Sequence, residues 1–259
     1  MADLRASLLM RRTTPKRLPP RQRSLEKPDM AGSPKSRHLR LQVGRVADRR
    51  MFRLALGLAF LAGFIDATGF ILLGGIFVAS PETFATMFAV NLANGWGRAA
   101  QIGLLVIGVV SGAMAGTRIV HRSGRNPRTA VVVIVACLLA TAFYLNLSDV
   151  VLWPGFLLSA AIGMAHCTLD GSDDLVAQAM SATHQLVRLG EGLADLCLGR
   201  KAANMVAPLL FGFAFLGGAV VAALGHFVLA SASLGLGTVI AAILIPIALA
   251  ADRAGSRRA

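Results

Sequence analysis

The sequence predicts an all-α, polytopic membrane protein with about six transmembrane helices in two inverted three-helix halves, together with short interfacial or re-entrant helices. Of its 259 residues, 55% are apolar and only 15% are charged, which is too little charge to cover the surface of a soluble domain of this length. Six apolar stretches follow a basic first segment, and the last three weakly repeat the first three.

The first segment, residues 1–52, is expected to be a disordered, basic cytoplasmic tail. Residues 1–53 carry fifteen of the 26 Lys and Arg residues, only four acidic residues and five prolines. Such a composition cannot bury apolar area. The positive charge favours anionic lipid head groups as the partner of the tail, and the lack of aromatic residues before Phe52 argues against nucleic acid. Translation from Met51, directly before the first span, would leave the tail out.

Residues 53–259 form the predicted transmembrane domain in the lipid bilayer, with halves at about 53–148 and 152–251. A helix needs about 20 residues, with a range of about 17–25, to cross the hydrocarbon core. Six apolar stretches meet this requirement: Leu54–Val78, Ala99–Val120, Ala130–Leu147, Trp153–Leu169, Met205–Leu229 and Leu234–Ala250.

Two further segments are expected to lie in the membrane interface or to re-enter the protein interior. Phe84–Leu92 is apolar but too short to span, and Leu175–Leu198 is amphipathic. The acidic stretch Ser172–Asp174 suits the N-terminus of the second helix, because carboxylates there interact favourably with the helix dipole.

Basic residues predict the orientation of the spans. The loop after the second span contains Arg122 and Arg125, and Arg257 lies near the end of the chain. Because Lys and Arg accumulate in cytoplasmic loops, both termini are expected on the cytoplasmic side of a bacterial inner membrane. Trp96 and Trp153 would then lie at the outer interface, where indole rings are enriched.

The two halves share a short pattern in their first spans. Gly-Phe-Ile-Asp-Ala at 63–67 corresponds to Gly-Met-Ala-His-Cys at 163–167. Three spans per half is an odd number, so the second half would cross the membrane in the opposite direction, with a site near the midplane where the halves meet. Five glycines in the apolar stretches are expected to let neighbouring helices pack closely. They are Gly63, Gly108, Gly112, Gly116 and Gly218.

Asp66 is the polar residue that stands out in the first span. A carboxylate at the centre of a transmembrane helix costs roughly 2.5–3.5 kcal/mol on insertion scales, so it is expected to point into the bundle. His166, its counterpart in the repeat, would lie across the midplane, and the pair could form a proton relay through a water molecule. A structural role for Asp66, as the partner of Thr68, a broken helix end or a nearby hydroxyl, stays open. His226 and His184 are weaker candidates for an ion or substrate path.

No pattern in the chain predicts an enzyme, a cofactor or a metal ion. The Gly-x-Ser-x-Gly nucleophile elbow, the His-Glu-x-x-His zinc motif, the P-loop and the dinucleotide-binding glycine pattern are all absent. Cys137, Cys167 and Cys197 lack metal-ligand spacing and are expected to be buried thiols.

The run at 58–78 resembles the opening span of the YoaK-like family, bacterial inner-membrane proteins that carry a domain of unknown function. The resemblance covers essentially residues 54–251 and includes Gly-Phe-x-Asp-Ala at 63–67, Ile-Gly-Met-Ala-His at 162–166 and the segment 186–196. It implies the membrane topology and fold. A transport role follows from it only by analogy of architecture.

Two departures from the family pattern identify the chain as a divergent member. Where the family has Met-Thr-Gly-Asn after the first span, this chain has Pro-Glu-Thr-Phe at 81–84. The matching Thr-Gly of the second half is Thr183-His184 here, and the family's glutamine is His166. If these motifs line a shared site, the site differs in this protein.

Two functions stay open from the sequence. The leading hypothesis is a transporter or channel for a small solute or ion, with Asp66 and His166 as its central polar residues. The alternative is a structural or interaction protein of the membrane whose basic tail binds lipid or a cytoplasmic partner. Assembly with a second copy of the chain is compatible with both.

Overall fold

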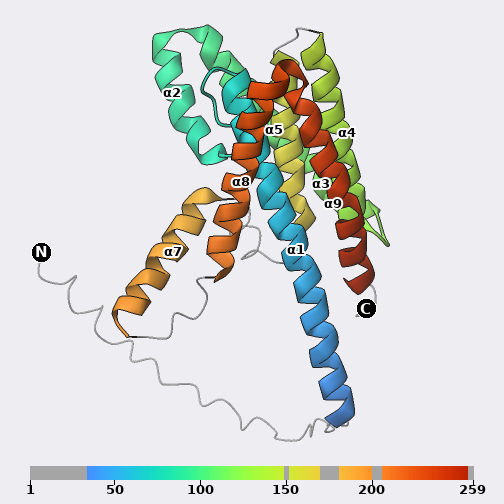
Figure 1. Cartoon of the computed structure of the whole chain (residues 1–259). Coiled ribbons are helices and arrows are strands. Elements are labelled where there is room, and N and C mark those ends of the chain that lie inside the picture. The colour runs from blue at the N-terminus through green and yellow to red at the C-terminus, as the bar shows by residue number, and fades with distance from the viewer. Residues whose placement is uncertain (1–33, 149–151, 170–180, 200–205, 256–259) are drawn as a thin grey trace, which may run out of the picture. The chain divides into compact units, whose positions relative to one another are not determined.

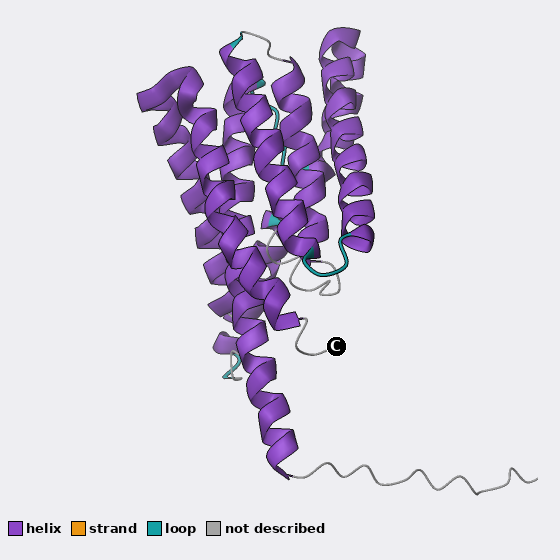
Figure 2. Cartoon of the chain, turned by 90° about the vertical axis from the view of Figure 1, so that its right-hand side faces the viewer, coloured by secondary structure: helices purple, strands orange, loops and turns teal. Residues whose placement is uncertain are grey.

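The computed structural model describes residues 34–148, 152–169, 181–199 and 206–255, and within these ranges the chain forms helices, short 3₁₀ turns and loops, without a strand (Figure 2). The chain divides into the units Met1–Leu39 and Arg40–Ala259, and the description below concerns the second. In this unit the longer helices run side by side as a bundle (Figure 1). The elements are α1 (Pro34–Leu72), η1 (Pro81–Thr83), α2 (Phe84–Asn94), α3 (Trp96–Arg122), α4 (Pro127–Leu147), α5 (Leu152–His166), η2 (Cys167–Leu169), α7 (Ala182–Cys197), α8 (Val206–Leu229), η3 (Ala230–Ser233) and α9 (Leu234–Gly255).

The described helices indicate a polytopic membrane protein. One apolar stretch, Val206–Ala254, has 49 residues, and as a single helix it would measure about 74 Å, more than twice the roughly 30 Å of a hydrocarbon core. The chain instead turns at η3, where Ala230 has a φ of 47°, and α8 and α9 have 24 and 22 residues, each enough to cross alone. The stretches long and apolar enough to cross a membrane are Arg49–Leu72, Trp96–Arg122, Pro127–Leu147, Leu152–Leu169 and Val206–Ala254.

The first apolar helix is shorter than the sequence predicts, because α1 ends at Leu72 and not near Val78. Gly74 and Gly75 follow with φ angles of 62° and 98°, a region that residues with a Cβ rarely adopt, and they reverse the chain. Residues 76–80 are non-helical and lead through η1 into α2. We call residues 73–80 the return segment.

Helix α2 is apolar, has 11 residues and packs against the first half of α3 (Figure 1). At about 16 Å it is too short to cross a bilayer, as the sequence predicts for Phe84–Leu92. Its first residue, Phe84, is buried, whereas Phe88 and Leu92 are exposed. The return segment and α2 together therefore form a hairpin beside the bundle.

Helix α1 begins at Pro34, inside the segment 1–52 that the sequence predicts to be disordered. Proline suits the first turn of a helix, where its missing N–H would have no partner in any case, and no further proline occurs between Pro34 and Leu72. The division into a tail at 1–52 and a transmembrane domain at 53–259 stays a prediction. Residues 1–33 lie outside the described residues.

The amphipathic segment forms α7, which occupies most of the expected range Leu175–Leu198. Ser181 caps this helix, since its side chain accepts the backbone N–H of His184 at 3.3 Å. The acidic stretch 172–174, expected to begin the helix, lies outside the described residues. The large apolar side chains exposed on α7 are Leu186, Val187, Leu193 and Leu196.

Helices α1 and α8 cross with their backbones in contact at two glycines. A Cβ placed on Gly63 would overlap the carbonyl oxygen of Phe215. A Cβ placed on Gly218 would overlap the carbonyl oxygen of Phe60. Helices approach this closely only where both present small residues.

Helices α3 and α5 cross in the same manner. A Cβ on Gly163 would overlap the carbonyl oxygen of Val109, and one on Gly112 would overlap that of Ala160. The third close pair is α4 with α9, which pack along each other. Two more glycines of α3 extend its contact with the α5 region: Gly108 lies against Ser159, and Gly116 against Cys167 and Met164.

Side-chain contacts identify which helix ends lie together. At one end, Arg50 Nη1 donates to the carbonyl oxygen of Ala250 at 3.0 Å, which joins α1 to α9. At the opposite end, Asn146 Nδ2 donates to the carbonyl oxygen of Ser231 at 3.0 Å, which joins α4 to η3. The first end carries the exposed arginines Arg49, Arg53, Arg118, Arg122, Arg125 and Arg253, whereas the exposed Trp96 and Trp153 begin helices at the other.

Asp252 is a buried carboxylate of α9 that caps the first turn of α4. Its Oδ2 accepts the N–H and the hydroxyl of Thr129 at 2.9 and 2.8 Å, and its Oδ1 pairs with Arg128 at 3.4 Å. We expect Asp252→Ala to lower the free energy of unfolding by about 1–3 kcal/mol, because it removes a cap and the counter-ion of an arginine. Asp252→Asn keeps an acceptor oxygen and should lose less. Unfolding followed by circular dichroism in detergent micelles measures both, and a loss below about 0.5 kcal/mol in Asp252→Ala would contradict the assigned cap.

Candidate functional site

Asp66 is a buried carboxylate that holds the return segment against α1. It is 6% exposed, and its Oδ1 accepts the backbone N–H groups of Val78 and Ala79, each at 2.7 Å. These two amides belong to non-helical backbone and have no helical acceptor. Because an unpaired N–H at membrane depth costs several kcal/mol, the carboxylate permits a non-helical segment at this position.

Other contacts fix the return segment from its outer end. The guanidinium of Arg98, in the first turn of α3, donates to the carbonyl oxygen of Gly74 in the reversal. The side chains of Leu73, Ile76 and Val78 are buried in the hydrophobic core. The segment is therefore anchored at the glycine turn, along its apolar side chains and at Asp66.

A pocket of about 270 Å³ lies beside Asp66, between α1, the return segment and α8. The Oδ2 atom of Asp66 accepts no hydrogen bond from any residue that the structure describes. The rings of Phe70 and Phe77 lie 4.8 Å apart, and both are about two-fifths exposed, so the pocket opens on the surface of the bundle. The lining residues are Gly63, Asp66, Ala67, Phe70, Ile71, Phe77, Phe215, Ala219 and Ala223.

His166 does not line this pocket. Its Nδ1 lies 2.8 Å from the carbonyl oxygen of Ile162, one turn earlier on α5. No hydrogen bond joins His166 to Asp66 in the described chain. Asp66 and His166 therefore have separate partners, and no direct hydrogen bond supports a proton relay through this pair.

The other two histidines are also separate from the pocket. The Nε2 atom of His184 lies 3.5 Å from Nε of Arg188, both on α7. His226 lies in the last turn of α8 and is partly buried. Neither residue lines the Asp66 pocket, so the four polar candidates from the sequence do not form one site.

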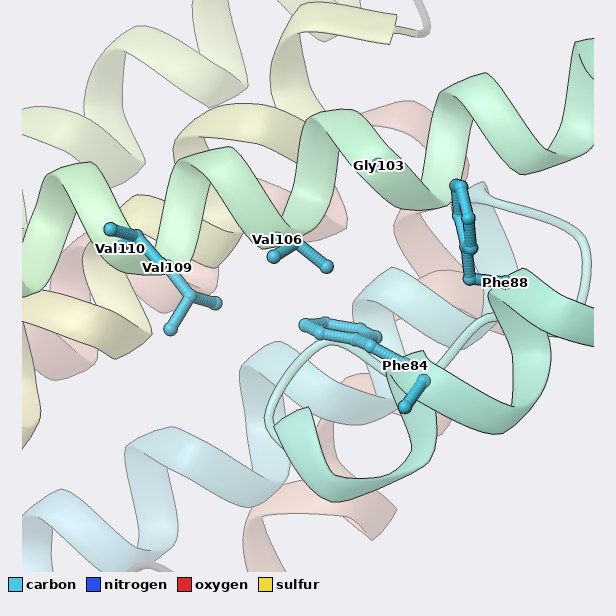
Figure 3. A pocket seen from close by; sticks show the side chains of 7 residues that line it. Phe84, Phe88, Gly103, Val106, Val109 and Val110 are labelled. Atoms are coloured by element: carbon cyan, nitrogen blue, oxygen red, sulfur yellow. The ribbon is translucent and has the colours of Figure 1, made fainter.

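A larger cavity of about 510 Å³ lies between α2 and α3 and offers no polar side chain (Figure 3). Phe84 and Phe88 project into it from α2, opposite the valines of α3. A cavity without charges or hydrogen-bonding side chains can hold an apolar chain but cannot orient a polar solute. The smaller pocket at Asp66 is therefore the candidate functional site. The larger cavity is lined by Phe84, Ala85, Phe88, Gly103, Val106, Val109 and Val110.

Among the residues with described positions, no group of three or more His, Cys, Asp or Glu side chains could hold a metal ion. The expectation of buried thiols is wrong for two of the three cysteines. Cys137 and Cys197 are exposed on the outside of their helices, and only Cys167 is partly buried. An apolar run in a membrane protein turns some of its side chains toward lipid, so an apolar neighbourhood in sequence does not imply burial in protein.

Two functional contacts could not be recognised from side-chain patterns. The partners of Asp66 are the main-chain amides of Val78 and Ala79, groups that every non-proline residue has. The pair Gly74-Gly75 was the available signal, since adjacent glycines mark chain reversals. Asp252 follows the last apolar stretch and resembles a solvated acid until the packing of α9 on α4 is known.

A family model described as "Protein of unknown function (DUF1275)" matches residues 54–247. No curated protein matches the chain. No solved structure matches it either.

Proposed function

Because the chain belongs to the DUF1275 family, whose function is unknown, we propose a function from its own geometry: a transporter or channel for a small solute or ion, and not an enzyme. One observation carries the proposal. A carboxylate inside a membrane-spanning helix holds a non-helical segment with one oxygen and leaves the other oxygen free at a pocket. Ionisable side chains at membrane depth mark ion or substrate paths in many membrane proteins.

The two halves are inverted copies, with spans α1, α3 and α4 in one and α5, α8 and α9 in the other. The crossings at glycines support this relation. The first span of each half crosses the second span of the other, α1 with α8 and α5 with α3. The contacts correspond pairwise. Gly63 of α1 meets a carbonyl of α8, and Gly218 of α8 meets a carbonyl of α1. In the same way, Gly163 of α5 meets a carbonyl of α3, and Gly112 of α3 meets a carbonyl of α5.

Contacts between the third spans of the two halves, α4 and α9, support the same inverted relation. Asp252, near the end of α9, binds the start of α4, and Asn146, near the end of α4, binds the turn before α9. Six spans cross alternately, so α5 runs opposite to α1. Substrate sites in inverted-repeat transporters lie where the halves meet and involve discontinuous helices. The Asp66 pocket fits this description, because α1 and α8 come from different halves.

The return segment and α2 form a re-entrant hairpin in the membrane. Asp66 lies six residues before the end of α1, about 9 Å from that end, and the amides of Val78 and Ala79 reach the same depth. Irregular backbone occurs at this depth only where it is buried in protein or lines a cavity. Both conditions hold here, since Val78 is buried and Phe77 lines the pocket.

The arginine-rich end of the bundle faces the cytoplasm. The membrane is a bacterial inner membrane, as the resemblance to the YoaK-like family implies. The part of α1 around Arg50, the start of α4 and the end of α9 share this end. An excess of Lys and Arg is typical of cytoplasmic loops. Both termini are then cytoplasmic, and anionic lipid head groups are the proposed partner of the basic tail.

Proton flux in liposomes tests the proposal. Wild-type protein and Asp66→Asn would be reconstituted with a trapped pH-sensitive dye under an imposed potential. Asparagine keeps an acceptor oxygen for Val78 and Ala79 but carries no charge, so we expect normal insertion and a flux at least about tenfold lower. Glu191→Gln, which removes an exposed carboxylate on α7, should leave flux unchanged. Equal flux in wild type and Asp66→Asn, or no wild-type flux above empty liposomes, would refute the role of Asp66.

A further inference from the structure

The pocket beside Asp66 has a negative group with unused hydrogen-bonding capacity. A carboxylate offers about four acceptor positions on its two oxygens, and the two amides of the return segment use Oδ1 alone. Asp66 as a residue is 6% exposed, and no described residue donates to its Oδ2. Because Asp66 lines the pocket, a molecule bound there can supply a further donor to this carboxylate.

The charges around the pocket favour a cation as that donor. No Lys, Arg or His side chain lines the pocket, so none of its lining residues neutralises Asp66. A positively charged N–H donor adds to the hydrogen bond a direct Coulombic attraction to the carboxylate, which a neutral donor lacks.

The remaining walls favour an apolar body attached to the cation. Apart from Asp66, every lining residue is glycine, alanine, isoleucine or phenylalanine. Phe70 and Phe77 present two neighbouring rings, and aromatic rings attract ammonium groups within about 6 Å of their centres. A hydrated metal ion would gain nothing from these walls, whereas an alkyl or aryl group would fill them.

The volume limits the size of the ligand. At about 270 Å³ the pocket lies just below the range of about 300–1,000 Å³ that is usual for drug-sized ligands. We propose that this pocket binds a small organic ammonium ion with one ring or short alkyl chain, its nitrogen on Asp66 Oδ2 and its carbon body between α1 and α8. The proposal names the substrate class of the transporter proposed above and rests on that function.

Equilibrium binding to the full chain in detergent micelles tests this site, with benzylammonium as the probe and benzyl alcohol as its neutral counterpart. Isothermal titration should give saturable benzylammonium binding to wild type and at least tenfold weaker binding to Asp66→Asn. Benzyl alcohol should bind both proteins weakly and equally. Uptake of either probe into micelles is the same for the two proteins and cancels in the comparison.

Two phenylalanine variants separate the pocket from the rest of the surface. Phe77→Leu removes a ring of the pocket and should weaken benzylammonium binding several-fold, whereas Phe213→Leu removes an exposed ring of α8 outside the pocket and should not. Thermal unfolding of each variant within a few degrees of wild type establishes that the comparison concerns folded protein. Equal benzylammonium affinity in wild type and Asp66→Asn, or equal weakening by Phe213→Leu, would overturn the site.

Binding and flux can fail independently. Benzylammonium binding that depends on Asp66, with neither proton flux nor benzylammonium uptake in liposomes, would support the site and refute transport. Proton flux that depends on Asp66, without benzylammonium binding, would support the proposed function and refute this substrate class.

Discussion

Replacing Asp66 by alanine is expected to lower the free energy of unfolding by about 2–6 kcal/mol. The substitution leaves the amides of Val78 and Ala79 buried without an acceptor, and each unsatisfied buried group costs about 1–3 kcal/mol. The alanine methyl group cannot reach either amide. The return segment should therefore detach from α1 before the rest of the bundle unfolds, because its remaining anchors are the Arg98 contact and its apolar side chains.

Amide hydrogen exchange locates this effect in the chain. The amides of Val78 and Ala79 should exchange slowly in wild type and in Asp66→Asn, and much faster in Asp66→Ala. Glu82→Ala is the matched control, since it removes an exposed carboxylate next to the same segment and should change stability by no more than about 0.5 kcal/mol. Slow exchange of both amides in Asp66→Ala would show that the carboxylate does not anchor the segment.

The contrast between alanine and asparagine separates the two roles that the sequence left open. A purely structural Asp66 would tolerate asparagine in every assay, because asparagine retains an acceptor for the amides. A carboxylate that also serves the pocket would tolerate asparagine in stability and fail in flux and binding. The structure shows Oδ1 in the structural role, and the role of Oδ2 in the pocket is the proposal that the flux and binding assays test.

Most helices were predictable because bilayer thickness sets their lengths. The stretch predicted at Ala130–Leu147 is α4 with one added turn at Pro127, and the prediction of Leu234 as the start of the last span is confirmed. The all-α class follows from the same signal, since long apolar runs separated by short polar loops leave few alternatives. Such runs can be recognised from composition because lipid excludes charge along the whole span.

The end of α1 was not predictable by the same means. Hydropathy continues without a break through Ile76 and Val78, and an apolar run does not distinguish a helix from a buried extended segment. The helix ends at the reversal formed by Gly74 and Gly75, and the non-helical segment after it is held by a carboxylate twelve residues before Val78. Asp66 can bind the amides of the return segment only because the chain reverses after α1, and that reversal is visible only in the tertiary structure.

Asp66 was predictable as the site residue, but its hydrogen-bond partners were not. Asp66 could be selected because a carboxylate in an apolar span is rare. His166 was selected by its place in the repeat, yet its ring lies near the carbonyl of Ile162 on its own helix. The repeat relates positions in the two halves, and related positions need not touch. In the crossings, each glycine meets a different helix from its counterpart.

Alanine at Gly63 is expected to destabilise the protein by about 3 kcal/mol, at the upper end of the range for overpacked cores. The added Cβ meets a main-chain carbonyl of Phe215, which has no rotamer to adopt, so α1 and α8 must separate along the crossing. Gly190→Ala is the control: Gly190 lies in the interior of α7 with open space around its Cα, and alanine there should stabilise the helix by up to about 1 kcal/mol. Unfolding in detergent micelles measures both variants, and a neutral Gly63→Ala would contradict the backbone contact.

Combined variants extend this result to the relation between the halves. Once α1 and α8 have separated for Gly63→Ala, a second Cβ at Gly218 meets less resistance, so the double variant should lose less than the sum of the two single losses. Gly163→Ala creates the corresponding overlap between α5 and α3 and should cost as much as Gly63→Ala within about 1 kcal/mol. If the halves are inverted copies, their first spans carry equivalent crossings and similar losses follow. A large loss at Gly63 with none at Gly163 would contradict that equivalence while leaving the α1–α8 crossing intact.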